Sequence, residues 1–276
     1  VRGRCAWCMA MAGWRHGYWR NDLSGVARAA GVTPLTATRL LAVMPHPDDE
    51  AYAAGGTLAL AADRGAAAAV LCVTAGEGGG DATVRDGELN ASCRVLGAER
   101  LATLGWPDGG IAAQAQHHGP DAVVTLTRAI AAWRPDVVLG LGDDGVYGHL
   151  DHLALNRLLR AACAQVSALT MPVALWEACF PPAHFHPVWR ALRRQRVAGV
   201  AKGWTPAHFG TPVLDGDLVV DVGPVADRKR ASIAAHASQL GDRDPADFLR
   251  PELMRPLLEE ERWRAVVVPR GDPGSA

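Results

Sequence analysis

Two short clusters of histidine and acidic residues each come after an apolar run that has the length of a strand. The first cluster is Pro45-His46-Pro47-Asp48-Asp49-Glu50, and the second is Tyr147-Gly148-His149-Leu150-Asp151-His152. Burying several ionisable groups together without a cation is costly. Neutral imidazole and carboxylate are both ligands that zinc accepts. The two clusters therefore predict a metal site that is built from two loops.

Each cluster also has an explanation that needs no metal. The acids at positions 48–50 could simply cap a helix that starts near Tyr52, where acidic residues are favoured. Capping accounts for one acid and leaves His46 unexplained. The second cluster could be a polar helix start, yet His149 and His152 are three residues apart and are expected to lie one turn apart on one helix face. The presence of both clusters in one chain favours the shared metal site.

The elements that must position these clusters alternate between strand-like and helix-like patterns from residue 39 onward. The unbroken apolar run at 67–74 is typical of a parallel strand that is buried on both faces. We expect strands at 39–44, 67–74, 100–104, 136–140, 172–177 and 218–222, and helices at 55–64, 86–96, 121–133, 149–165 and 225–238. This alternation predicts a doubly wound α/β fold, in which ligands bind beyond the carboxyl ends of the strands.

Two segments interrupt the alternation. Residues 181–212 are rich in Pro, His, Trp and Arg and predict a loop-rich insert, whose aromatic side chains either pack locally or cover a substrate. Residues after Arg243 are expected to form a peripheral tail with some helix near Arg255 to Trp263. We therefore expect an N-terminal extension at 1–37 and a single domain at 38–276 that carries the insert.

The composition argues against several classes of protein. The formal net charge of −1 gives no reason to expect nucleic acid or an acidic membrane as a partner. No apolar run reaches the roughly 18 residues of a membrane span, and the apolar patch around Cys5 is a poor signal peptide, so we expect a cytoplasmic protein. Cys5 and Cys8 form a lone CxxC, which is weak support for a structural zinc, and the cysteines suggest no disulfide framework.

In their strand contexts the two clusters resemble the PIG-L/LmbE family of zinc-dependent N-acetylglucosaminyl deacetylases. Further elements of the family pattern are Arg85 with Glu88-Leu89, the run from Leu104 to Gly109, and Lys229 before the segment Ala235 to Gln239. The resemblance runs from about Leu41 to Leu240, and Pro45 departs from it because many members have a small residue there. It implies a Rossmann-like three-layer α/β sandwich with a mostly parallel central sheet.

The resemblance also implies a cofactor and its ligands. His46, Asp49 and His152 would bind one Zn2+ ion and leave a position open for water. Zinc can lower the pKa of its bound water to about 7 and polarise an amide carbonyl. The sequence does not distinguish zinc from ferrous iron as the metal used in the cell.

The remaining site residues take their roles from the same resemblance. Asp48 would be the general base. His149 would act as the general acid or as electrostatic stabiliser of the tetrahedral oxyanion, with help from Tyr147. The candidates for substrate binding are Arg85, Asp108 and His236, and the last two could instead support the residues that contact the substrate.

The expected reaction is hydrolysis of the N-acetyl group of an N-acetylglucosamine unit on a larger small-molecule glycoconjugate. The Trp-rich insert favours a large aromatic acceptor, so the expected conjugate is a glycopeptide-antibiotic pseudoaglycone of the teicoplanin type. The alternative is a deacetylase or amidase of a glucosaminyl-inositol thiol pathway. The oligomeric state is not predicted.

Three rival classes remain weaker. A metal-dependent sugar-binding protein without catalysis would have no need of both Asp48 and His149. A phosphoester hydrolase usually has two metals or a basic phosphate pocket. The run from Gly140 to Gly145 matches the dinucleotide fingerprint GxGxxG, but Asp143 and Asp144 would repel a pyrophosphate.

Overall fold

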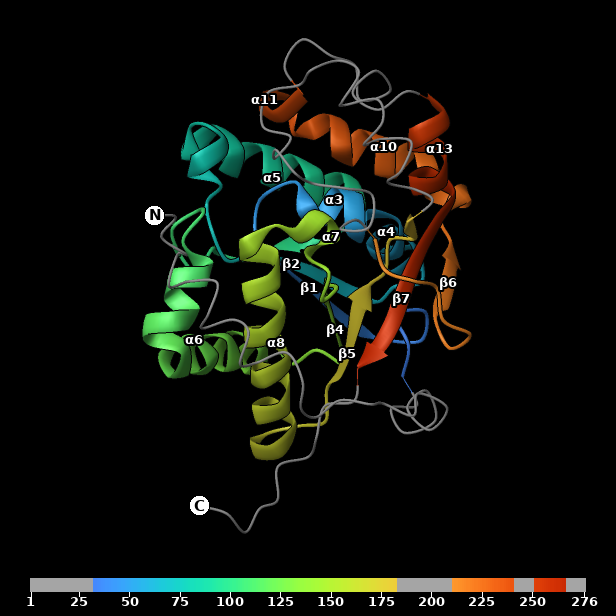
Figure 1. Ribbon diagram of the computed structural model, residues 1–276. Coiled ribbons are helices and arrows are strands. Elements are labelled where there is room, and N and C mark those ends of the chain that lie inside the picture. The colour runs from blue at the N-terminus through green and yellow to red at the C-terminus, as the bar shows by residue number, and fades with distance from the viewer. Residues whose placement is uncertain (1–31, 183–209, 241–250, 267–276) are drawn as a thin grey trace, which may run out of the picture.

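The computed structural model describes residues 32–182, 210–240 and 251–266, and the seven strands in these ranges form one sheet (Figure 1). The strands are β1 (Arg39–Met44), β2 (Ala67–Cys72), β3 (Glu99–Arg100), β4 (Val137–Leu141), β5 (Ala174–Ala178), β6 (Leu218–Asp221) and β7 (Glu260–Val266). Their order is β3-β2-β1-β4-β5-β7-β6. Strands β1 to β5 pair in parallel, and β7 pairs antiparallel with both β5 and β6. The expected α/β fold with a mostly parallel sheet is confirmed.

Helices cover both faces of the sheet and complete the three layers. Helices α6 and α8 lie on one face, and α4, α5 and α10 lie on the other (Figure 1). The helices are α3 (Asp49–Ala53), α4 (Gly55–Asp63), α5 (Ala82–Leu96), α6 (Ile111–Trp133), α7 (Gly145–Gly148), α8 (Leu150–Leu169), α10 (Ala226–Ala235), α11 (Ala237–Leu240) and α13 (Pro251–Glu259), and 3-10 turns occur at Glu77–Gly79 and Gly223–Val225. None of the helices in the described ranges has the length and apolarity needed to cross a membrane.

Strand side chains alternate between two hydrophobic cores. In β1, Leu41 and Val43 belong to the core beneath α6 and α8, whereas Leu40, Ala42 and Met44 belong to the core beneath α4 and α5. All five are fully buried. Because successive side chains of a strand point to opposite faces, a strand covered on both sides is apolar throughout. This packing explains the unbroken apolar runs of β1, β2 and β4.

The strand order places the two chemical clusters side by side. From β1 the chain crosses to β2 and then β3, and it returns to place β4 on the other side of β1. The order therefore reverses between β1 and β4, whose residues Leu40 and Val137 are paired in register. Such a switch point opens a crevice at the carboxyl ends of the two strands. Loops 45–48 and 142–149 begin at this crevice.

The C-terminal segment corrects the expected peripheral tail. Helix α13 ends at Glu259, and the chain then enters the sheet as β7 between β5 and β6. Trp263 is fully buried, and its Nε1 donates to Thr57 Oγ1 at 2.9 Å. Glu261 accepts hydrogen bonds from the backbone N–H groups of Gly56 and Thr57 and from Lys229 Nζ. The expected helix through Trp263 was wrong because the many Glu and Arg residues hid the strand alternation, in which Glu261 and Trp263 point inward.

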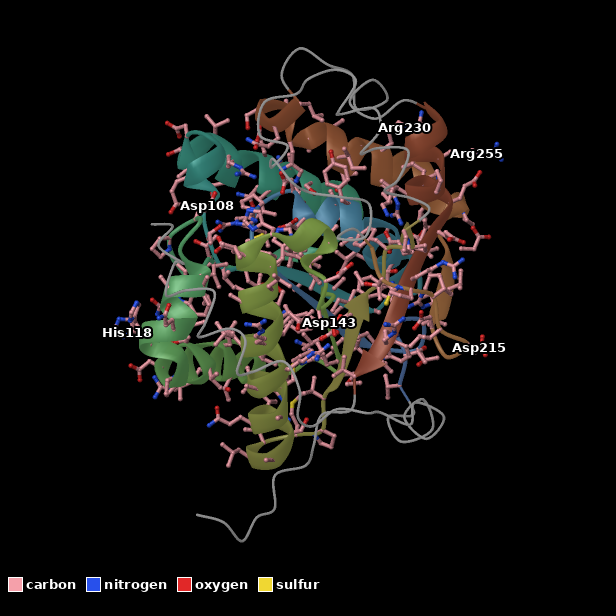
Figure 2. All side chains as sticks on the ribbon, viewed as in Figure 1. Asp108, His118, Asp143, Asp215, Arg230 and Arg255 are labelled. Carbon is pink, nitrogen blue, oxygen red and sulfur yellow. The ribbon has the colours of Figure 1, made fainter. Side chains whose placement is uncertain are left out.

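Smaller differences concern element ends. The third strand has only two residues, Glu99–Arg100, and the expected continuation to Leu104 is a loop. Helix α6 begins at Ile111, earlier than expected, and is kinked at His118, whose side chain lies on the outer surface of the protein (Figure 2). Cys72, Cys93, Cys163 and Cys179 are free and buried. The CxxC and most of the 181–212 insert lie outside the described residues.

Candidate active site

His46 follows β1 and is surrounded by three carboxylates. Its Nδ1 lies 3.2 Å from Asp49 Oδ2, and its Nε2 lies 3.1 Å from Asp108 Oδ1 and 3.3 Å from Asp151 Oδ2. Burial lowers the pKa of His46, but the hydrogen bonds to Asp151 and Asp49 and the nearby negative charges raise it to about 10. A buried imidazole among acids marks a place that favours positive charge, whether from a proton or from a metal ion.

His152 comes from the first turn of α8 and meets His46 across the crevice. The two ring centroids are 5.4 Å apart, and His152 Nε2 lies 3.5 Å from Asp49 Oδ2. Its Nδ1 lies 3.1 Å from the carbonyl oxygen of Gly145. Since a carbonyl can only accept, Nδ1 carries the proton and Nε2 presents its lone pair toward Asp49. Burial lowers the pKa of His152 to about 4, which keeps the ring in the neutral form that binds metals.

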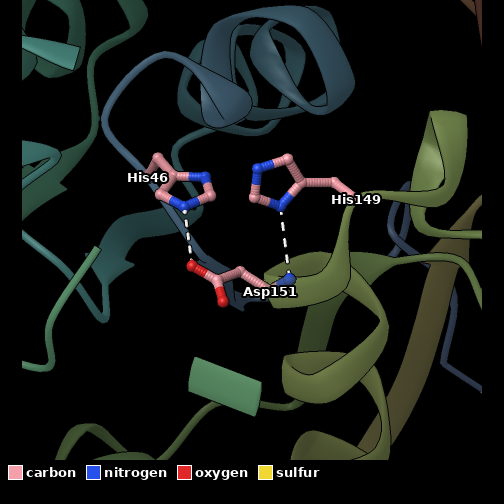
Figure 3. Close-up of side chains that lie close together, drawn as sticks. All are labelled: His46, His149 and Asp151. Carbon is pink, nitrogen blue, oxygen red and sulfur yellow. Dashed lines mark hydrogen bonds and ion pairs between the residues drawn. The ribbon is translucent and has the colours of Figure 1, made fainter. Parts of the chain in front are cut away.

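Within the described chain, two groups of side chains have donor atoms within 4.8 Å of one another and could hold a metal ion. One is the expected set His46, Asp49 and His152, and the other is His46, His149 and Asp151. Figure 3 shows the second group, in which Asp151 Oδ2 faces His46 while the Asp151 backbone N–H donates to His149 Nδ1.

The expected set fits a divalent metal better than the second set. Both oxygens of Asp151 accept backbone hydrogen bonds, from Gly109 N at 2.7 Å and Ile111 N at 3.0 Å, and the side chain is fully buried. His149 Nδ1 is engaged as the N-terminal cap of α8. Asp49 Oδ2, in contrast, lies between the rings of His46 and His152. Two imidazoles and a carboxylate are also the protein ligands of several catalytic zinc sites.

Asp48 has an unusual backbone conformation beside the expected ligands. It precedes α3 with φ 115° and ψ −32°, a region in which a residue with a Cβ is strained by about 1–3 kcal/mol. Its carboxylate makes no helix-capping hydrogen bond and lies 3.3 Å from Arg85 Nη2. Burial and the charge of Asp49 raise the pKa of Asp48 to about 7, and Arg85 opposes this shift. Helix capping therefore does not explain why Asp48 is present.

Arg85 and Asp108 lie together at the edge of this group. Arg85 is 3% exposed and donates hydrogen bonds to the carbonyl oxygens of Gly76 and Pro47. Its Nη1 lies 4.0 Å from Asp108 Oδ2, which accepts from the backbone N–H of Gly78. The structure thus brings both expected substrate-binding residues next to His46 and Asp48, and their role toward a substrate stays a prediction.

The last two expected site residues lie differently. His236, the C-terminal cap of α10, is 1% exposed and sits behind the crevice, where its Nε2 lies 2.7 Å from Glu50 Oε1. Its expected contact with substrate stays a prediction. Tyr147 belongs to α7, but its side chain lies outside the described part of the structure.

The sequence did not predict the structural roles of Asp151 and Glu50. Asp151 appeared only as a member of the second cluster or as a helix-start acid, and its partners at Gly109 and Ile111 come from a distant loop. Glu50 appeared only as a possible cap, yet it is fully buried. A charged residue next to a metal motif was the only available signal, because contacts across the fold leave no local pattern.

The sequence matches known proteins over this same region. Residues 41–163 match the family described as PIG-L, GlcNAc-PI de-N-acetylase. The chain is 32% identical to a 1D-myo-inositol 2-acetamido-2-deoxy-alpha-D-glucopyranoside deacetylase of Rhodococcus jostii, with 86% of this chain and 93% of the relative aligned. The protein of the same name from Rhodococcus opacus is 33% identical, over 85% of this chain and 93% of that protein. The chain therefore belongs to the PIG-L family.

Solved structures support the same fold. A conserved protein from Thermus thermophilus has a TM-score of 0.57 and 25% identity and covers 86% of this chain and 98% of its own. The zinc-inhibited form of a teicoplanin deacetylase has a TM-score of 0.56 with 18% identity, over 83% of this chain and 98% of its own. A 4-carboxy-2-hydroxymuconate hydratase also matches, with a TM-score of 0.57 and 20% identity over 86% of this chain and 99% of its own. At such identities the last two show the fold alone.

Proposed function

We propose that this protein is a metal-dependent deacetylase that hydrolyses the N-acetyl group of an N-acetylglucosamine unit linked to inositol. The donor set of His46, Asp49 and His152 at the switch point, with Asp48 beside it, carries the reaction class. The two Rhodococcus relatives support the glucosaminyl-inositol substrate. The expected glycopeptide pseudoaglycone has less support, because the teicoplanin deacetylases resemble this chain at an identity that shows only the fold.

His46, Asp49 and His152 would hold the ion. A bound divalent metal would activate water and polarise the amide carbonyl. Asp48 would accept the proton of the attacking water, and the proposal is supported by the nearby charge of Asp49 and by Arg85 Nη2, which lies 3.3 Å from the Asp48 carboxylate. Metal analysis of the purified protein would distinguish zinc from ferrous iron.

His149 is suited to donate a hydrogen bond. Its Nδ1 accepts from the Asp151 backbone N–H at 3.2 Å, so the proton of the neutral ring lies on Nε2. The His149 ring centroid is 5.1 Å from that of His46 and 4.6 Å from that of His152, which places it next to the expected ligands. From there the Nε2–H of the neutral ring would donate a hydrogen bond to the oxyanion, and Asp48 would pass the proton taken from water to the leaving amine.

The charges around the crevice favour an uncharged conjugate. Asp48, Asp49, Asp108 and Asp151 surround His46 or lie beside it. Among the described residues that contact these acids, Arg85 is the only one with a permanent positive charge, and it is already engaged by Asp48 and two carbonyl oxygens. Neutral sugar and inositol hydroxyls suit such a site, whereas a phosphate would find no free cationic side chain among these residues. This supports free glucosaminyl inositol over a phosphatidylinositol conjugate.

Amine release from three conjugates tests the proposal. N-acetylglucosaminyl inositol, N-acetylglucosaminyl phosphatidylinositol and an N-acetylglucosaminyl glycopeptide pseudoaglycone would be compared at equal concentration. We expect the first to have the highest kcat/KM. Preference for the pseudoaglycone would restore the antibiotic substrate, and saturable binding of every conjugate without amine release would indicate a sugar-binding protein.

A further inference from the structure

The strained backbone of Asp48 is held in place by bonds from three directions. Its N–H donates to Glu50 Oε2 at 2.9 Å, and its carbonyl oxygen accepts from Ala51 N at 3.0 Å. Its carboxylate lies 3.3 Å from Arg85 Nη2. A residue with a Cβ keeps a positive φ of this size only where surrounding bonds fix it. Loss of one of these bonds would therefore let Asp48 relax toward an ordinary conformation.

Glu50 links the backbone of Asp48 to side chains from other helices. Its side chain is fully buried, and its Oε1 accepts from Ser92 Oγ at 2.5 Å and lies 2.7 Å from His236 Nε2. Ser92 Oγ lies 2.7 Å from Ser232 Oγ. Ser92, Ser232 and His236 are all buried and come from α5, α10 and the end of α10. One glutamate thus connects two helices to the backbone of Asp48.

We propose that Glu50 and His236 form a positioning pair that holds Asp48 in its productive conformation, with His236 acting through Glu50 and not on the substrate. The proposal rests on the proposed role of Asp48 as the base. Neither residue belongs to the two donor groups that could hold a metal, and both lie below the surface of the crevice. They reach Asp48 through the hydrogen bond from its N–H to Glu50 Oε2, and their charges also act on its carboxylate, where His236 lowers the pKa of Asp48 and Glu50 raises it.

A purely structural pair would stabilise the fold without any special link to Asp48. The two possibilities differ in what happens when Asp48 is already disabled. A group that works by placing Asp48 has nothing left to place in an Asp48→Asn enzyme, so its removal costs little further activity. A structural group would lower stability equally in both backgrounds and would lower activity by the same factor in both.

The test is a double-mutant cycle between His236→Ala and Asp48→Asn, with bound metal, kcat, KM and melting temperature measured for each protein. In the wild-type background we expect His236→Ala to lower kcat roughly 10- to 100-fold, with KM changed less than twofold and the metal retained. In the Asp48→Asn background the same substitution should change kcat less than about twofold. Equal factors in the two backgrounds, or loss of metal from His236→Ala, would overturn the proposal.

Three further variants guard against simple misfolding. In His236→Gln the side-chain amide can donate to Glu50 Oε1 in place of the imidazole, and we expect most of kcat to return. Ser92→Ala removes another donor to Glu50 and should lower kcat by a smaller factor. Thr57→Ala is the matched control, because it breaks a buried hydrogen bond to Glu261, remote from Asp48. It should lower the melting temperature with kcat unchanged. A loss of kcat that follows melting temperature across all these variants would contradict the positioning role.

Failure of the proposed function has a different signature. If Asp48→Asn alone kept near-normal kcat, Asp48 would not be the base, and the positioning proposal would fall with that role. If Asp48→Asn lost activity as expected while the cycle was additive, the base would stand and only the positioning pair would be rejected.

Discussion

The loops after β1 and β4 contribute to the same crevice but are held in different ways. In the β1 loop (residues 45–48) every carbonyl oxygen accepts a hydrogen bond, and most of the donors come from other elements. Pro45 O accepts from Thr74, His46 O from Cys72 Sγ and Asp49 N, Pro47 O from Arg85, and Asp48 O from Ala51. The loop is therefore fixed by α5 and by the segment after β2.

The β4 loop (residues 142–149) makes many of its hydrogen bonds to itself. Gly145 N donates to Gly142 O, Gly148 N to Asp144 O, and Val146 N to Asp144 Oδ1. Gly145, Val146 and Gly148 all have positive φ, and for the β-branched Val146 this is a strained conformation. A loop of this kind keeps its own shape while depending less on neighbouring helices.

The difference suggests a division of labour between the two loops. The β1 loop carries the proposed base, which needs a fixed position against the ligands. The β4 loop carries His149, whose proposed contact is with the oxyanion of the substrate. Substitutions in each loop should therefore affect different quantities, and the following predictions separate them.

The largest loss of activity is expected when one of the two histidines that would bind the metal is replaced. His46→Ala in the β1 loop and His152→Ala beyond the β4 loop each reduce three protein ligands to two. Metal should be lost from both, and turnover should fall by roughly 10³ or more, because metal polarisation is worth several kcal/mol. Elemental analysis of the purified variants is the check. One full equivalent of metal in both proteins would remove these residues from the site.

Asp48→Asn should separate chemistry from metal binding. The amide keeps the shape of the side chain but cannot accept the proton, so turnover should fall by roughly 10² or more while metal remains bound. Parallel measurement of kcat and metal content tests this. Near-normal turnover would transfer the role of base to another group, with His149 the nearest candidate.

His149→Ala should leave the metal in place and lower turnover by about 10², the usual loss when one oxyanion donor is removed. The substitution also removes the N-terminal cap of α8, which costs about 1 kcal/mol of stability. His149→Asn, which can still cap, controls for that cost. Loss of the metal from His149→Ala would instead support the alternative ligand set of His46, His149 and Asp151.

The smallest of these effects is expected for Asp151→Asn. Asp151 lies against His46 Nε2, but its two oxygens also accept hydrogen bonds from the backbone N–H groups of Gly109 and Ile111. Removing the charge should weaken metal affinity or activity by roughly 10- to 100-fold, as for other residues that orient a ligand. Titration of the metal-free protein measures the affinity. An unchanged affinity together with unchanged turnover would show that Asp151 serves only the backbone.

Sequence patterns predicted the parts of this molecule that depend on local periodicity. The strands that flank the crevice and the two His-Asp clusters could be located because buried parallel strands are apolar throughout and metal ligands follow their ends. The C-terminal strand β7 was missed, since Glu260, Arg262 and Arg264 make its sequence look like a solvated helix. Burial of Glu261 depends on Lys229 and the start of α4, which no local pattern records.

The same limit applies to the site. The positions of His46, Asp49 and His152 followed from their motifs, but the pairing of Glu50 with His236 joins residues 186 apart in the sequence. The positive φ of Asp48 could not be predicted from residue types either, because only contacts in the assembled fold stabilise this conformation. The aromatic residues Trp189, Trp204 and Phe209, expected to pack locally or cover a substrate, lie outside the described residues.

Metal dependence of amine release is the most direct test of the central claim. Wild-type protein would be stripped with a chelator, dialysed, and titrated with Zn2+ or Fe2+ while amine release from N-acetylglucosaminyl inositol is followed. The account predicts no release without metal and a linear return of activity that ends at one equivalent per chain. Full turnover by the metal-free protein, or a metal-loaded protein that binds this conjugate without releasing amine, would contradict it.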